Sequence, residues 1–260
     1  MNSSIKNEKS NKTKLVLLKV VAVVLALALW QILASVIKQP ILLVTPLQVA
    51  KRLLTIWREV GFWSTIGFTL IRILGGFFLG LFLGILLAGL SDKYKAIEIL
   101  LWPYMVTIRS VPIASIVVIC LIWLSGANLS IFISFLIVIP VIYQNVLTGL
   151  KNRDPELNEA AEVNGATGFK KFKYVTLPQI SPFLYSACTV TIGMAWKAGV
   201  AAEIIGTPQG SIGQMLYLSK IFLDTDGLLA WTVVLVILSI ICEKLILLLI
   251  KSIINKISHF

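Results

Sequence analysis

The chain alternates long apolar segments with short polar ones, a pattern that predicts membrane-spanning helices. A bilayer span needs about 18 or more apolar residues in a row. Period-2 alternation, which marks membrane strands, is absent, so the sequence predicts a helical bundle and not a barrel. We expect an all-α membrane protein with six spans, at about Leu15–Ile37, Ile66–Leu90, Ile97–Trp123, Leu129–Leu150, Ile180–Ile205 and Leu228–Ile250.

A polar, lysine-rich tail of residues 1–14 precedes the first span and has the composition of a disordered segment. A basic tail before an apolar run also resembles a secretory signal. The apolar region of a signal has about 7–15 residues, and this run is longer, which favours an uncleaved anchor. Residues 15–260 are predicted to form a single transmembrane domain.

Three local patterns add detail to the spans. The segment "PLQVAKRLLTIWREVGFW" places Val49, Leu53, Ile56 and Trp57 at helical spacing, as in a helix lying at the membrane surface. In the second span, glycines repeat every four residues, which lets helices approach closely; packing inside the bundle is favoured over a dimer interface. In the third span, Pro112 predicts a break in the helix and non-helical backbone facing a cavity or other protein.

The distribution of charge predicts how the chain is oriented in the membrane. The net charge is +11, but with 58% hydrophobic residues and a mean hydropathy of +0.93, asymmetric loop charge explains it better than binding to nucleic acid. Most lysines and arginines outside the spans fall in segments that are cytoplasmic if the N-terminus is inside. We therefore expect both termini in the cytoplasm. The exceptions are Lys38, Lys51, Arg52, Arg58 and Lys220.

The chain offers little chemistry for catalysis or metal binding. Cys120, Cys188 and Cys242 fall inside apolar runs without metal or disulfide spacing, and His259 is the only histidine. An intramembrane enzyme would need HExxH, a buried Asp pair or a Ser with a base, and none is present. The sequence predicts no catalytic residue and no metal site.

One polar segment between the fourth and fifth spans has a helical pattern of its own. Asp154 is a good N-cap, Pro155 suits the first turn, and Gly165 suits the left-handed position after a helix end. Leu157, Ala160, Ala161 and Asn164 share one face, which the alanines make shallow. Thr167 can cap a second helix with Phe169, Phe172 and Val175 on one side, and Leu177-Pro178 is expected to end it. The segment, residues 151–178, is thus predicted to be a helix, glycine bend and second helix, either docking a partner or forming a solvated loop; we name it the elbow.

The elbow resembles the EAA signature of binding-protein-dependent ABC transporter permeases. "EAAEVNG", nine residues and "VTLP" match EAA, three residues, G, nine residues and I-x-LP, with Val175 in place of Ile. The matching positions are Glu159, Ala160, Ala161, Gly165, Leu177 and Pro178. The resemblance implies that these residues couple the chain to a cytoplasmic ATPase, within a type I importer (MetI-like) bundle.

Nearly the whole chain is similar to the sulfonate, nitrate and taurine subgroup of these permeases. The similarity rests on "TLIRILGGFFLG", "IRSVPIAS" and "AWKAGVAAEIIG". It implies a prokaryotic plasma-membrane subunit that imports a small anion, or alternatively a vitamin precursor or other small organic solute. The implied partners are a second permease copy in a homodimer, two ATPase subunits and an extracytoplasmic binding protein. No GxxxxGK[ST] motif occurs, so ATP and Mg²⁺ are expected on the ATPase and no cofactor on this chain.

A few polar or aromatic residues within the spans are predicted to line the pathway. Charges at such depth are costly and need a partner or a water-filled cavity. The predicted residues are Arg109, Pro112, Trp196, Lys197 and Glu203. A structural pair between Arg109 and Glu203 is equally compatible with the sequence. An ATP-independent channel or carrier is disfavoured, because it would not need the elbow and the chain shows no inverted repeat.

Overall fold

The computed structural model describes residues 2–258; Met1 and residues 259–260, His259 among them, lie outside it. The described residues form helices joined by short connections, with no strand among them. They fall into two compact units, Met1–Val60 with Leu218–Thr232 and Gly61–Tyr217 with Val233–Phe260.

The first unit contains α1 (Asn2–Ile37) and α2 (Pro46–Ile56). The helix of α1 includes the tail that the sequence led us to regard as disordered, so that prediction was wrong. Residues 2–14 contain no Pro or Gly that would end a helix. The helix predicted in this segment is present as α2, where Thr45 and Gln48 form a reciprocal capping box. Val49 and Ile56 form its buried face.

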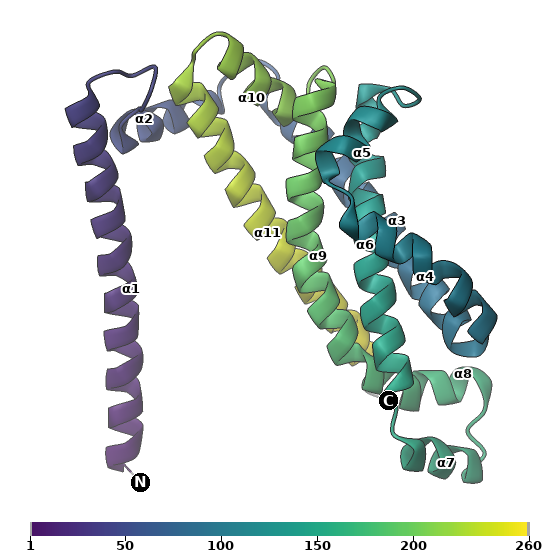
Figure 1. Ribbon diagram of the computed structural model, residues 1–260. Coiled ribbons are helices and arrows are strands. Elements are labelled where there is room, and N and C mark those ends of the chain that lie inside the picture. The colour runs from purple at the N-terminus through teal and green to yellow at the C-terminus, as the bar shows by residue number, and fades with distance from the viewer. Residues whose placement is uncertain (1, 259–260) are drawn as a thin grey trace. The chain divides into compact units, whose positions relative to one another are not determined.

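Three long helices form the core of the second unit: α3 (Phe62–Lys93), α6 (Gly126–Lys151) and α9 (Leu177–Gly206). Of these, α6 packs along both α3 and α9, as Figure 1 shows. Ile73 and Phe77 from α3, Ile142 from α6 and Ile192 from α9 are almost completely buried. The rest of this unit is arranged around that three-helix centre.

A seam of glycines explains why α3 and α6 lie so close. A Cβ added to Gly80 would come within 2.8 Å of Val138 Cβ, and one added to Gly84 within 2.9 Å of Ile142 Cβ. A Cβ on Gly76 would similarly meet the backbone of α6. The glycine repeat thus packs inside the bundle, as we expected, and not against a second copy.

The third apolar segment is broken where Pro112 predicted it. α4 (Lys95–Ser110) and α5 (Ile113–Cys120) are bent by 102°. Between them Val111 is extended, with φ −79° and ψ 133°, the region favoured for a residue before proline. Both short helices contact α6.

The remaining elements are α7 (Pro155–Val163), α8 (Gly168–Lys171), a π-helix (Phe172–Thr176), α10 (Ile212–Ile221) and α11 (Thr225–Ser258). Of the described helices, five are long and apolar enough to span a membrane, and six spans result if the α4–α5 pair counts as one. The predicted all-α bundle is therefore confirmed, and the number of spans agrees with the predicted six if α4 and α5 form one broken span.

Sequence reasoning missed α10. The signal was present as S-x-x-Q. The Ser211 hydroxyl accepts a hydrogen bond from the backbone N–H of Gln214 at 2.9 Å, and the Gln214 side chain accepts from Gly210 N at 2.7 Å. This pattern starts a helix in the way a capping box does.

Candidate functional site

The elbow begins with α7, and its N-terminus is capped as the sequence predicts. The Asp154 carboxylate accepts hydrogen bonds from Glu156 N at 2.9 Å and Leu157 N at 3.4 Å. Pro155 occupies the first turn, where its missing donor has no cost. These contacts fix where the chain turns from the connection after α6 into α7.

Gly165 makes the bend at the other end of α7. Its φ is +72°, and the chain closes with two backbone bonds of 2.9 Å, from Gly165 N to Glu162 O and from Ala166 N to Ala161 O. This is a Schellman motif, in which a left-handed residue ends a helix. A Cβ at Gly165 would touch nothing within 4 Å, so the constraint is the backbone conformation and not space.

The second half of the elbow runs into the fifth span without interruption. α8, the π-helix and α9 form continuous helix from Gly168 to Gly206, so the helix does not end at Leu177-Pro178 as expected, although α9 itself begins at Leu177. Leu177 N bonds to Phe172 O, five residues back, and this wider turn accommodates the ring of Pro178. Thr167 occupies the N-cap position of α8, but its side chain makes no capping bond.

The elbow presents an apolar surface that nothing in its own unit covers. No residue of α7 is buried, and Ala160 and Glu159 are exposed while Ala161 is half-buried. The large exposed apolar side chains are Leu157, Val163, Phe169 and Phe172. Val163 was not on the predicted face. Leu177 is buried and Pro178 half-buried, so these two act inside the bundle.

Two contacts anchor the start of the elbow to the bundle. Arg153 Nη2 lies 2.7 Å from Asp92 Oδ2 at the end of α3, and Arg153 Nε donates to Leu150 O at 2.6 Å. Lys151 pairs with Glu98 of α4. Both pairs are partly exposed, so we expect them to fix the position of the elbow more than to stabilise the fold.

Gln179 is a residue of this region that sequence reasoning missed. Its side-chain oxygen accepts from Asp154 N at 2.7 Å, and its amide nitrogen donates to Val175 O at 3.1 Å. One side chain therefore ties the first turn of α9 to the cap of α7. Only the folded arrangement brings positions 154 and 179 together, so no local pattern could have shown it.

A second link joins the two halves of the elbow. Lys171 Nζ lies 2.6 Å from Glu162 Oε1, and this hydrogen bond and positive charge lower the pKa of Glu162. Glu159 lines an open depression of about 470 Å³ together with Asp92, Arg153, Asn158 and Lys171. Thus Glu159 lies beside the anchoring pairs, at the base of the elbow.

Of the residues predicted to line the pathway, some are exposed and others lie in the core. Trp196 is buried and Lys197 is exposed on α9. Glu203 is fully buried, and its Oε2 accepts from Thr69 Oγ1 at 2.9 Å and from Gly213 N at 3.2 Å. The structure shows no ion pair between Glu203 and Arg109, so that possible pairing was wrong.

Arg109 and Pro112 lie at the break between α4 and α5, and both are exposed. Arg72, by contrast, is held inside the unit, where its Nε donates to Ala127 O at 2.7 Å and its guanidinium lies over the Phe68 ring. Among the described residues, no group of three or more His, Cys, Asp or Glu side chains could hold a metal ion.

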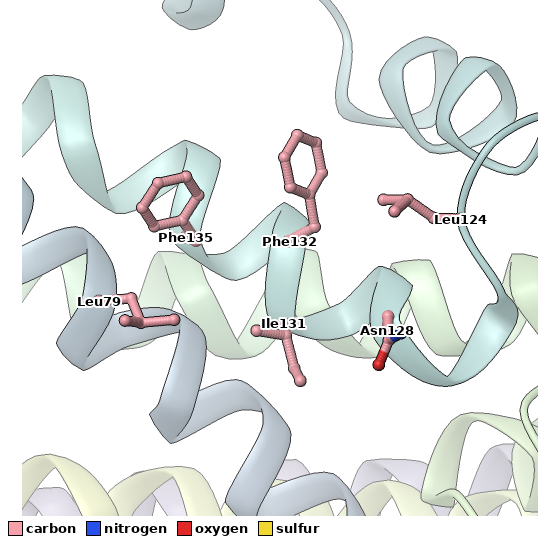
Figure 2. Close-up of a pocket in the computed structure, with 6 residues that line it drawn as sticks. All are labelled: Leu79, Leu124, Asn128, Ile131, Phe132 and Phe135. Atoms are coloured by element: carbon pink, nitrogen blue, oxygen red, sulfur yellow. The ribbon is translucent and has the colours of Figure 1, made fainter.

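A separate cavity of about 320 Å³ lies beside α6 and is apolar. Figure 2 shows Phe132 and Phe135 on α6 and Leu79 on α3 around it. Leu124 and Ile131 complete its apolar lining, and Asn128 is the polar member. Such a surface suits acyl chains or another apolar helix and offers no group that would recognise a charged solute.

Comparison with known proteins places these features in context. The model of a family described as "binding-protein-dependent transport system inner membrane component" matches residues 80–258. The taurine transport system permease protein TauC of Escherichia coli (strain K12) is 28% identical over 82% of this chain and 80% of its own. The putative aliphatic sulfonates transport permease protein SsuC of Bacillus subtilis (strain 168) is 24% identical over 86% and 81%. The formylaminopyrimidine transport permease protein ThiX of Halalkalibacterium halodurans is 25% identical over 71% and 74%.

Proposed function

This chain belongs to the family of binding-protein-dependent transport system inner membrane components, and on that premise we propose that it conducts a small anionic solute through an ATP-driven importer. It is a multi-pass membrane permease subunit of the ABC transporter class, without catalytic activity of its own. Its role is to form the passage for the solute, while other subunits deliver the solute and hydrolyse ATP.

The elbow is our proposed contact with two ATPase subunits. The observation that carries this proposal is the exposed apolar surface of Leu157, Val163, Phe169 and Phe172, held on both sides of the Gly165 bend. Glu159, Ala160 and Ala161 lie on α7 beside that surface. ATP and Mg²⁺ would bind to the ATPase, and this chain needs no cofactor.

The arrangement in the membrane follows from the distribution of lysine and arginine. We place both termini and the elbow in the cytoplasm of a prokaryotic cell, with an extracytoplasmic binding protein on the other side. Two copies of the chain would form a homodimer with the pathway between them. The exposed Arg109, Pro112 and Lys197 are proposed to line it, whereas Trp196 and Glu203, predicted with them, are buried and would support it from the core. Closure of the ATPases would move the two elbows together and switch the direction in which the pathway opens.

An anion of the sulfonate type is the proposed solute. The taurine and aliphatic sulfonate permeases are similar along most of this chain, and Arg109 and Lys197 provide exposed positive charge within the spans. The formylaminopyrimidine permease supports a second candidate, a vitamin precursor. A melting screen of the associated binding protein against sulfonates and pyrimidines would separate the two.

The docking assignment is tested by changing the bend and the charge of the elbow. We expect Gly165→Val and Glu159→Lys to reduce both co-purification of the ATPase and ATP-dependent uptake. Gly165→Asn is the matched control, because asparagine tolerates the left-handed conformation. If both changed proteins retain the ATPase and transport normally, the elbow does not dock it.

A further inference from the structure

A polar cavity between α4 and α6 is separate from the elbow surface and has a volume of about 210 Å³. From α4 it is lined by Glu98, Trp102, Met105, Val106 and Arg109, which fall on one face at helical spacing. From α6 it is lined by Tyr143, Gln144, Leu147, Thr148 and Lys151. The two helices contact each other, so the cavity is a slot along their junction.

The charge around this slot is predominantly positive. At one end, the carboxylate of Glu98 pairs with both Lys95, at 3.0 Å, and Lys151. A single negative charge is thus shared by two cations. At the other end stands Arg109, about 16 Å farther along α4 for a rise of about 1.5 Å per residue. The slot therefore carries more positive than negative charge at both ends, which disfavours a cation as its occupant.

Arg109 and Gln144 are the polar side chains in the slot that remain available to bind a ligand. Within the described chain, neither side chain makes a hydrogen bond or an ion pair, although both line the same cavity. Arg109 lies in the last turn of α4, where the helix dipole supplies a partial negative charge of roughly half a unit. That partial charge leaves the guanidinium incompletely neutralised, and its five donors remain unused.

We propose that the Arg109–Gln144 end of this slot binds the charged oxygen group of a small anion, a sulfonate or a phosphate. A guanidinium binds such oxygens through two parallel hydrogen bonds, and the Gln144 amide adds a donor. The buried side chains of Met105 and Leu147 and the exposed Trp102 ring line the middle of the slot and suit a short organic chain.

Two sources share this chemistry. One is the transported solute, in which case the slot is a binding site along the translocation pathway; this assignment rests on the proposed function. The other is the phosphate of an anionic lipid. In both cases recognition comes from Arg109 and Gln144, and one set of variants tests it.

The test uses the complete permease–ATPase complex in nanodiscs of phosphatidylcholine, with ethanesulfonate as the probe in calorimetric titration. We expect saturable binding, weakened about tenfold or more by Arg109→Gln and by Gln144→Leu, and less by Arg109→Lys. The control is Arg58→Gln, which removes an arginine that stacks on Trp57 far along the chain from the slot. This control should bind the probe as the unchanged protein does.

A second arm adds phosphatidylglycerol to the nanodiscs and measures the lipid retained by native mass spectrometry. Retention that depends on Arg109, with weaker ethanesulfonate binding, identifies the lipid phosphate as the occupant; unchanged ethanesulfonate binding identifies the solute. If the unchanged protein binds neither probe, or if Arg109→Gln and Gln144→Leu bind both normally, the proposal is overturned. ATPase co-purification is followed in the same preparations, so failure of the elbow assignment would be seen separately.

Discussion

Thr69 and Glu203 are joined by a hydrogen bond of 2.9 Å although they stand 134 positions apart in the chain. The Thr69 hydroxyl donates to the carboxylate and accepts from Ile212 N at 3.0 Å, so α3, α9 and the start of α10 meet at one buried point. Because Glu203 and Thr69 are fully buried, loss of either partner leaves polar groups without water.

Thr69→Val should therefore destabilise the protein by about 1–3 kcal/mol, since it leaves the carboxylate and the Ile212 N–H short of a partner. Thermal unfolding in detergent measures this. Thr189→Val is the control on α9, because the Thr189 hydroxyl bonds only to Tyr185 O of its own helix. A double variant with Glu203→Gln should be non-additive; simple additivity would show that the two residues do not act together.

Gly80→Val tests the seam between α3 and α6. The added side chain must displace Val138, whose Cβ lies 2.8 Å from the position of a new Cβ, and overpacking of this kind costs about 1–3 kcal/mol or more. We expect a lower yield of monodisperse protein and a lower unfolding temperature. Gly75→Ala, five residues away with nothing within 4 Å of its added Cβ, should behave as the unchanged protein. Equal effects at both positions would contradict the assignment of the seam.

Gln179→Ala tests whether the tie to Asp154 transmits force. The lost bond is partly exposed, so stability should fall by only about 0.5–1.5 kcal/mol. We expect a larger effect on coupling, with ATP hydrolysis retained and solute uptake per ATP reduced. Gln179→Glu keeps an oxygen acceptor for Asp154 N and should transport better than Gln179→Ala in proteoliposomes. Identical coupling in the two variants would exclude this role.

The lowered pKa of Glu162 predicts a pH dependence for the link within the elbow. A carboxyl with a lowered folded pKa contributes stability above its usual pKa of 4.5 and loses it as the pH falls through the folded value. Near pH 5, carbodiimide labelling should modify Glu162 more slowly than Glu156 on the same helix. Lys171→Gln should remove the difference, as read by peptide mass spectrometry. Equal labelling of the two residues in the unchanged protein would contradict the pairing.

Local patterns predicted much of this architecture because their physical causes are local. The Asp154 cap, the Gly165 bend and the break at Pro112 each depend on a few neighbouring residues. The glycine seam could be predicted as a close contact, but the pattern could not name Val138 and Ile142 as its partners.

What the sequence could not show depends on groups brought together by folding. The bond from Asp154 to Gln179 crosses 25 positions, and the slot of Arg109 and Gln144 requires two separate helices. The π-helix before Pro178 was missed for another reason. Proline usually marks a boundary, and here the helix continues through a wider turn that precedes it.

The unbroken helix from Gly168 to Gly206 gives the elbow two mechanically different halves. On one side of Gly165, α7 is a short segment held by a few side chains. On the other, α8 belongs to a continuous helix about 58 Å long, at about 1.5 Å per residue over the 39 residues. In the proposed docking, a push of the ATPase on Phe169 would load one end of this helix and would reach its other end as a tilt or a shift of the whole helix.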